Sequence, residues 1–221
     1  MSVCVICPTR DNTYGLRTLF KSMIETSSHA TLVACVDDDQ EDLYHDKRIA
    51  WGERLKMFVG PRVGPSGSAD AAAIALKDRY DVFGVVPDDA EFSTTRWDEY
   101  LIEKIESFPG RIGVVSACHK DAFGFNPRDG QSACYFPFVS RQWLEVIGRL
   151  NPVKGNFHGC SDSALELLGE GTRIVRASEN EFYMIHDVMF PPMTESDKMD
   201  AMRFLGWCAC GTRRDQIEKL L

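Results

Sequence analysis

The sequence predicts an α/β fold, in which a mostly parallel central sheet is covered by helices on both faces. The first observation is that short, nearly continuous apolar runs alternate with longer segments of helical period through the first half of the chain. The second is that 44% of the 221 residues are hydrophobic, which is enough for one full core. The third is that no change in composition and no linker divides the chain. We therefore expect a single domain over residues 1–221.

Each expected element follows from its own pattern of apolar and polar residues. Strands are expected at residues 3–7, 31–36, 56–59, 82–86, 112–117, 136–139 and 173–177. Helices are expected at residues 14–25, 66–78, 95–107, 141–149 and 162–168, and again from about residue 195 onward. Ligands of open parallel sheets bind outside the carboxyl ends of the strands, so the loops at those ends are where function is expected.

The charge and the first residues limit the expected partners and compartment. The net charge is −8, from 25 basic and 33 acidic residues, which argues against a broad electrostatic hold on nucleic acid or on an anionic membrane. Residues 1–8 carry neither a charged leader nor a long apolar run, and no stretch reaches transmembrane length. These features predict a cytoplasmic protein without a membrane span.

The eight cysteines are expected to be reduced thiols. Cys4 and Cys7 match the C-x-x-C spacing of zinc and redox sites, but they lie in an apolar run that is typical of a strand. Residues three apart on a strand point to opposite faces of the sheet. The spacing therefore favours structural thiols over a zinc site.

The first expected strand runs into a polar loop at residues 8–12. Pro8 is expected to fix the turn, while Thr9, Arg10 and Asn12 supply hydrogen-bond donors for a nucleotide. An alternative interpretation is a simple helix entry, in which Asn12 caps the following helix.

The second expected strand ends in three carboxylates, Asp37, Asp38 and Asp39. An acidic residue at this position suits hydrogen bonds from a ribose hydroxyl or a base N–H. A solvated acidic loop is the alternative. Neither loop contains a G-x-G-x-x-G or P-loop motif, which argues against a dinucleotide dehydrogenase or a P-loop kinase.

The expected strand at residues 82–86 runs directly into Asp88, Asp89 and Glu91. Neighbouring carboxylates after a buried strand repel one another unless a cation compensates them, so they indicate a divalent ion. Mg²⁺ takes one or two protein carboxylates and completes its shell with phosphates and water, and Mn²⁺ prefers the same hard oxygen ligands. An acidic turn that leads to a helix cap is the alternative.

Together these loops resemble those of the GT-A glycosyltransferases, in particular the inverting, family 2-like enzymes of small bacterial and phage type. There a Pro-Thr loop follows the first strand, an Asp pair the second and a D-x-D-like motif the fourth. Here the three motifs read Pro8-Thr9-Arg10, Asp37-Asp38 and Asp88-Asp89-Ala90-Glu91. The resemblance implies a Rossmann-like GT-A fold with a nucleotide-binding half at 1–92 and an acceptor and catalytic half at 93–221.

The resemblance also implies roles for individual residues. The first two loops would bind the nucleobase and ribose of a nucleoside diphosphate sugar, and Asp88 would bind its ribose. Either Asp89 alone or Asp89 together with Glu91 would hold Mn²⁺ or Mg²⁺. The glycine-rich loop before the next helix, together with the start of that helix, would close over the nucleotide. Its predicted nucleotide-binding residues are Arg62, Gly67 and Asp70.

Two further residues follow from the resemblance in the second half. Asp162 lies where this family places its catalytic base at the start of a helix, although the usual Glu-Asp reads Ser161-Asp162 here. A helix N-terminus would keep that carboxylate ionised. His186 lies where a histidine after a late strand completes the metal site in a number of GT-A enzymes, and imidazole is an acceptable manganese ligand.

The predicted activity is metal-dependent transfer of a hexosyl or pentosyl group to an acceptor hydroxyl, with inversion. Acceptors of such enzymes include modified DNA bases, glycans and proteins, and the sequence does not select among them. Two alternatives stay open: a nucleotidyltransferase on a related fold, and a non-catalytic nucleotide- or carbohydrate-binding domain.

Overall fold

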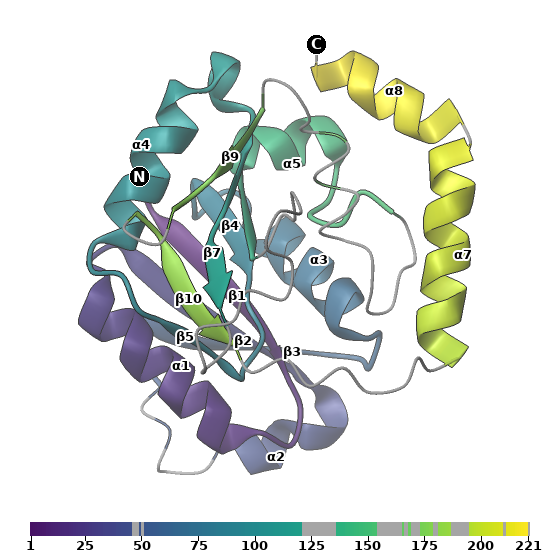
Figure 1. Ribbon diagram of the computed structural model, residues 1–221. Coiled ribbons are helices and arrows are strands. Elements are labelled where there is room, and N and C mark those ends of the chain that lie inside the picture. Colours follow the sequence, from purple (N-terminus) through teal and green to yellow (C-terminus); the bar gives the residue numbers. More distant parts are fainter. Residues whose placement is uncertain are drawn as a thin grey trace.

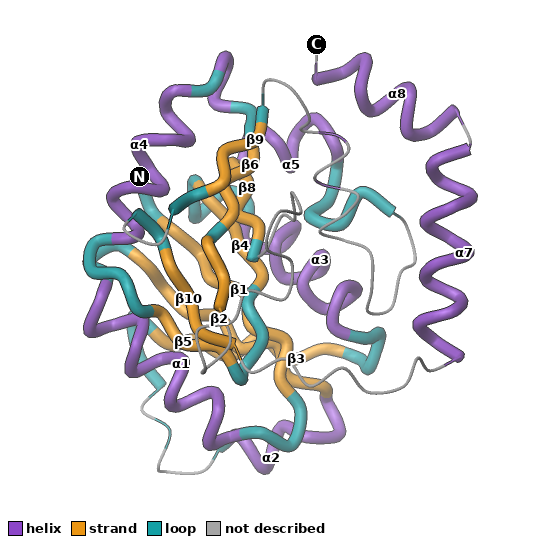
Figure 2. The backbone as a smooth tube through the Cα atoms, viewed as in Figure 1, coloured by secondary structure: helices purple, strands orange, loops and turns teal. Residues whose placement is uncertain are grey.

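The computed structural model describes most of the chain as a central sheet between two layers of helices (Figure 1). The described residues are 1–45, 49, 51–120, 136–153, 165, 168, 173–178, 181–186, 195–209 and 211–220. Figure 2 shows the strands in orange with helices on either side.

Within the described residues, the central sheet has seven strands in the order β3-β2-β1-β4-β8-β6-β9. These strands are β1 (Val3–Thr9), β2 (Ala30–Asp37), β3 (Leu55–Gly60), β4 (Val82–Val85), β6 (Val114–Ser116), β8 (Pro137–Ser140) and β9 (Ile174–Arg176). The strands β1 to β4 are mutually parallel where they pair, β9 is parallel to β6, and only β8 runs antiparallel to its neighbours. The mostly parallel sheet is therefore confirmed, and its seven strands are the seven that the apolar runs predict.

Helices cover both faces of this sheet. The helices are α1 (Thr13–Thr26), α2 (Glu41–Tyr44), α3 (Pro65–Leu76), α4 (Trp97–Ser107), α5 (Arg141–Ile147), α7 (Glu195–Ala209) and α8 (Gly211–Leu220), with short 3₁₀ turns at Asp38–Gln40 and Pro109–Arg111. One core cluster contains residues of α1, α2 and α4, and the other contains residues of α3, α5, α7 and α8. In Figure 1 the yellow helices α7 and α8 lie on the outer side of α3 and α5. No helix in the described ranges is both long and apolar enough to cross a lipid bilayer.

The alternation of side chains along β1 explains why both faces need a helical cover. Val5 and Cys7 pack in the first core cluster, whereas Cys4 and Ile6 pack in the second, and all four are fully buried. A strand that is buried on both faces must be apolar throughout, which produces the continuous run seen in the sequence. Cys4 and Cys7 therefore point to opposite faces, as their spacing predicts.

A second, three-stranded sheet has the order β5-β10-β7. Its strands are β5 (Ala90–Phe92), β7 (Cys118–Lys120) and β10 (Tyr183–His186). None of the three appears among the strands expected from the sequence: β5 overlaps the acidic motif, β7 directly follows the run expected at 112–117, and β10 ends in His186. An aromatic cluster joins this sheet to the central one: the ring centroid of Phe182 lies 5.5 Å from Phe138 of β8 and 5.1 Å from Trp97 of α4.

Several boundaries differ from those expected by a few residues, and two of these differences have a local cause. Strand β1 continues to Thr9, so Pro8 lies within the strand and does not form the turn. The pairing of β1 with β4 ends at Ile6, before Pro8. The missing N–H of proline therefore removes no hydrogen bond to β4. Helix α4 begins at Trp97 because Arg96 takes a left-handed conformation with φ 62°. The helix expected at 162–168 falls largely outside the described residues.

Candidate functional site

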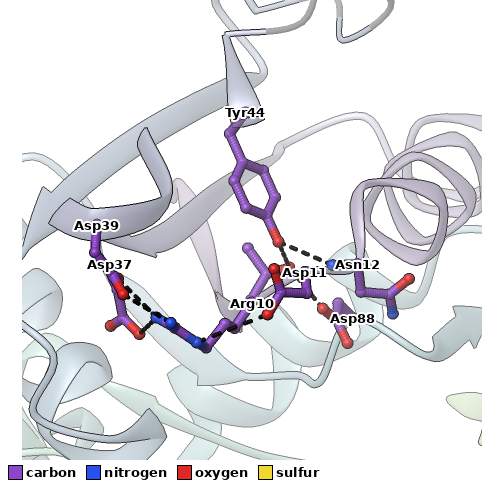
Figure 3. A network of polar contacts seen from close by, with 8 residues as sticks. Arg10, Asp11, Asn12, Asp37, Asp39, Tyr44 and Asp88 are labelled. Carbon is purple, nitrogen blue, oxygen red and sulfur yellow. Dashed lines mark hydrogen bonds and ion pairs between the residues drawn. The ribbon is translucent and has the colours of Figure 1, made fainter. Parts of the chain in front are cut away.

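Three polar loops meet at the carboxyl end of the central sheet. Strands β2, β1 and β4 are adjacent and parallel, so the segments that follow them emerge side by side. These segments carry Arg10, Asp37 and Asp88, and Figure 3 shows their side chains around one polar network. The topology therefore brings together the residues of all three predicted motifs.

Arg10 forms an ion pair with two carboxylates of the loop after β2. Its Nη1 lies 2.8 Å from Oδ2 of Asp37, and its two terminal nitrogens each lie 2.7 Å from one oxygen of Asp39. The hydrogen bonds from Arg10 lower the pKa of Asp39. The sequence predicts Asp37 and Asp38 as nucleotide-binding residues. In the structure Arg10 pairs with Asp37 and Asp39, and Asp38 is exposed at the first position of a 3₁₀ turn.

An apolar cavity of about 430 Å³ lies between the ends of β2 and β3 and the first turns of α3. Its lining residues are Val36, Phe58, Val59, Gly60, Pro61, Val63, Gly67, Ser68 and Ala71. The predicted residue Gly67 thus lines a cavity. Arg62 is exposed between two lining residues, and after Arg10 its charge contributes to lowering the pKa of Asp39. The cavity therefore lies beside the charged pair described above.

Asp88 lies in the loop that follows β4, and hydrogen bonds hold its carboxylate in place. Its Oδ2 accepts a hydrogen bond of 2.5 Å from the hydroxyl of Thr9, and that hydroxyl lies 2.8 Å from the hydroxyl of Tyr44. Burial raises the pKa of Asp88, against the lowering effect of hydrogen bonds from Thr9 and Asn12. A partly desolvated carboxylate with fixed orientation is suited to accept hydrogen bonds from a sugar hydroxyl.

Asp89 contacts His186 across the two sheets. Oδ1 of Asp89 lies 2.9 Å from Nε2 of His186, the last residue of β10. Burial by itself raises the pKa of Asp89. The hydrogen bond and the charge of His186 together lower this pKa by more than burial raises it, so the net shift is downward. The two predicted metal ligands are therefore neighbours, although they are 97 positions apart in the chain (186 − 89).

Glu91 lies away from this pair. In the antiparallel register of β5 and β10, Ala90 is opposite His186 and Glu91 is opposite Ile185. Residues directly opposite each other share a face, and successive residues alternate, so Glu91 and His186 lie on opposite faces of the small sheet. The sequence leaves Glu91 open as a second acidic ligand, and this register removes it from the candidate set.

The donor set of Asp89 and His186 fits a divalent ion of the manganese type. A carboxylate oxygen and a neutral imidazole are both suitable donors, and such ions leave the remaining positions to phosphate and water. In the part of the chain that the structure describes, no group of three or more His, Cys, Asp or Glu side chains is arranged to hold a metal ion. Asp89 and His186 are thus two candidate ligands among the described residues.

Asp70, a predicted nucleotide contact, makes structural hydrogen bonds within the protein. Its Oδ1 accepts hydrogen bonds from the backbone N–H groups of Leu150 and Asn151, at 2.8 Å and 2.9 Å. These bonds tie α3 to the segment after α5. The predicted base, Asp162, lies outside the described residues.

Two residues of the site have no sequence signal. Tyr44 is a single aromatic residue in a polar segment, and nothing in the local pattern places its hydroxyl under Asp88. Gly15 is an isolated glycine in an expected helix, where a close approach of another backbone is one known reason. A Cβ atom on Gly15 would overlap both the side chain of Asn12 and the backbone oxygen of Asp88.

The architecture described here is the GT-A fold of the glycosyltransferases. No protein-family model and no curated protein matches the sequence. Among solved structures, GalNAc-T7 with UDP, GalNAc and Mn²⁺ is similar to this chain with a TM-score of 0.68 and 12% identity over 93% of the chain. TarS 1–349 of S. aureus in complex with UDP is similar with a TM-score of 0.61 and 15% identity over 100% of the chain.

The chain is shorter than these two proteins. It covers 48% of the GalNAc-T7 chain and 71% of TarS 1–349. At these identities the similarity establishes the fold that the sequence motifs predict, and the activity has to be argued from the site.

Proposed function

We propose that the protein is a metal-dependent glycosyltransferase, which moves a sugar from a nucleoside diphosphate sugar to an acceptor hydroxyl with inversion. The observation that carries the proposal is the meeting of three polar loops, with Arg10, Asp37 and Asp88, at the carboxyl ends of adjacent parallel strands. On a GT-A fold this is the edge of the sheet where a ligand is expected.

The nucleotide would lie across the ends of β1, β2 and β4. Arg10, Asp37 and Arg62 offer both donors and acceptors for the edge of a nucleobase, and the apolar cavity beside them supports a planar, weakly polar ligand. Asp88 would accept hydrogen bonds from the ribose, because Thr9 holds its carboxylate in one orientation. The similarity to structures that contain UDP supports this placement.

Asp89 and His186 would hold Mn²⁺ or Mg²⁺. When bound, such an ion supplies charge that stabilises a departing diphosphate. The protein contributes the placement of the two donors: Asp89 and His186 are in contact, and His186 lowers the pKa of Asp89, which favours its ionised form. The similarity to GalNAc-T7, solved with Mn²⁺, supports a divalent ion.

Asp162 remains our proposed base, on the strength of the family resemblance alone. It would take the proton of the acceptor hydroxyl while the acceptor oxygen bonds to the anomeric carbon and the bond from that carbon to the diphosphate breaks. The proposal places this reaction in the cytoplasm and specifies the acceptor by its reacting hydroxyl.

A panel of nucleoside diphosphates and their sugar conjugates tests this proposal. Thermal shift with UDP, GDP and dTDP, each with and without Mn²⁺, should show stabilisation that requires both nucleotide and metal. Incubation with the matching nucleotide sugar should then release the nucleoside diphosphate, and Asp162→Asn should abolish that release.

The products separate the alternatives. Release of pyrophosphate from a nucleoside triphosphate incubated with a sugar phosphate would show a nucleotidyltransferase, since the sugar phosphate then attacks the α-phosphate and pyrophosphate leaves. Stabilisation by nucleotide without turnover of any sugar conjugate would show a binding domain. A flat response to every nucleotide in both metal conditions would contradict the proposal.

A further inference from the structure

Tyr44 places a buried hydroxyl directly beneath the candidate nucleotide site. It is the last residue of α2, and its side chain is fully buried in the core cluster that contains α1. Its hydroxyl oxygen lies 2.8 Å from Oγ1 of Thr9 and 3.2 Å from the backbone nitrogen of Asn12 (Figure 3). The indole N–H of Trp51 donates to the backbone oxygen of Tyr44 at 2.9 Å, which fixes the residue from behind.

The direction of each hydrogen bond in this network follows from counting donors. An ionised Asp88 can only accept hydrogen bonds, so the hydroxyl of Thr9 donates its one proton to the hydrogen bond with Asp88. The hydroxyl of Thr9 can then only accept from Tyr44, and Tyr44 in turn accepts from the N–H of Asn12. Burial raises the pKa of Tyr44, which keeps its hydroxyl protonated and able to donate. The result is a one-way chain from Asn12 through Tyr44 and Thr9 to Asp88.

We propose that Tyr44 is a positioning residue, which acts through the Thr9 hydroxyl to orient the carboxylate of Asp88 for the nucleotide. This inference rests on the proposed function, in which Asp88 binds the ribose. Without Tyr44, the hydroxyl of Thr9 loses its donor and is free to rotate away from Asp88. Hydrogen bonds in a chain polarise one another, so loss of the first weakens the last.

The same chain connects three segments that are distant in sequence. Tyr44 follows the loop that carries Asp37 and Asp39, Thr9 ends β1, and Asp88 follows β4. A change in the loop after β2 is thereby transmitted to the carboxylate after β4. The hydroxyl of Tyr44, the hydroxyl of Thr9 and the carboxylate of Asp88 thus connect the nucleobase side of the proposed site to its ribose side.

A double-mutant cycle tests whether Tyr44 acts through Thr9. The variants are Tyr44→Phe, Thr9→Val and the double variant, and the first readout is the dissociation constant for UDP, GDP and dTDP with Mn²⁺ by calorimetry. Tyr44→Phe should weaken binding roughly three- to tenfold, and Thr9→Val at least as much. The double variant should bind no more weakly than Thr9→Val, since the relay is already broken at Thr9.

Tyr80→Phe is the matched control. Tyr80 is also buried, and its hydroxyl accepts a hydrogen bond from Lys56, but it precedes β4 and so lies at the opposite end of the sheet. This variant should bind nucleotide as the unaltered protein does. If Tyr44→Phe and Thr9→Val give additive losses, or if Tyr80→Phe weakens binding equally, the relay is wrong.

A readout without nucleotide separates this inference from the proposed function. The side-chain ¹³C carboxyl signal of Asp88, assigned with Asp88→Asn and recorded at one neutral pH, should move in Tyr44→Phe and not in Tyr80→Phe. The same change should be absent when Tyr44→Phe is introduced into Thr9→Val. Lack of nucleotide binding by the unaltered protein would overturn the proposed function, whereas an unmoved Asp88 signal would overturn the relay.

Discussion

Gly15 of α1 lies directly against the backbone oxygen of Asp88, so closely that a Cβ atom at position 15 would overlap it. The first turn of α1 and the loop after β4 therefore pack backbone to backbone at the candidate site. Close approach of two backbones requires a residue without a side chain.

Gly15→Ala should therefore displace the loop that carries Asp88. Overpacking of this kind costs about 1–3 kcal/mol of the free energy of unfolding, and it should also weaken binding of nucleotide. Chemical denaturation and calorimetry measure the two effects.

Gly206→Ala provides the control for Gly15→Ala. Gly206 also lies within a helix, but a Cβ atom there meets nothing within 4 Å. Alanine has the higher helix propensity, so this variant should stabilise the protein by up to about 1 kcal/mol and leave nucleotide binding unchanged. Equal effects of the two substitutions would show that helix propensity, not the approach to Asp88, decides the result.

Asp70→Ala should destabilise the protein without affecting nucleotide binding. The substitution leaves the N–H groups of Leu150 and Asn151 without their acceptor, at a cost of about 2 kcal/mol. Denaturation and calorimetry on the same sample check both parts. A loss of nucleotide affinity in a protein that is still folded at the assay temperature would restore Asp70 to the binding site.

The ion pair of Arg10 with Asp39 should make stability depend on pH in the acid range. Arg10 lowers the pKa of Asp39 in the folded protein, so the unfolded chain binds the proton more readily. The stabilisation is therefore complete above the unfolded pKa of about 3.9 and is lost as the pH falls through the lower folded value. The difference in the free energy of unfolding between the unaltered protein and Arg10→Met should be constant near neutral pH and shrink below about pH 4.

Lys77→Met is the control for this charge change. Lys77 is exposed at the end of α3 and has no carboxylate partner among the described residues. Its substitution should show no such acid transition. A pH-independent difference for Arg10→Met would contradict the role of the ion pair.

Asp89→Asn and His186→Ala should each weaken the binding of Mn²⁺, by at least about tenfold. Each substitution removes one of the two neighbouring donors. Titration of Mn²⁺ in the presence of nucleotide, followed by electron paramagnetic resonance, measures the loss. Glu91→Gln is the matched control, because Glu91 belongs to the same motif but lies on the opposite face of the small sheet. An equal loss in Glu91→Gln would contradict the separation of the two faces.

Local pattern and tertiary structure contribute differently to the site. The seven strands of the central sheet are recoverable from the sequence because each contains a short apolar run, and strands such as β1 and β2 are buried along most of their length. The three strands of the small sheet are not predicted: β5 overlaps the acidic motif, β7 directly follows the run expected at 112–117, and β10 ends in His186. The opposite faces taken by Glu91 and His186 are likewise hidden in the sequence, because they depend on the register between β5 and β10.

The chemistry of the site follows the same division. Arg10, Asp37, Asp88 and Asp89 are predictable because each is polar directly after an apolar strand, and parallel topology then brings them to one edge. Asp70 is also an aspartate, in the helix after the glycine-rich loop, yet its carboxylate accepts hydrogen bonds from two backbone N–H groups some 80 positions away. A single sequence does not record which partner a carboxylate finds.

The sequence by itself determined the α/β class, the positions of the central strands along the chain and the polar residues at the ends of those strands. It did so because burial on both faces and strand-end loops leave local, periodic traces. Only the tertiary structure decided that Asp39 and not Asp38 pairs with Arg10, that His186 meets Asp89, and that Tyr44 lies beneath Thr9. Those contacts depend on register, turn geometry and long-range packing, which fix distances to a fraction of a side chain and leave no pattern along the chain.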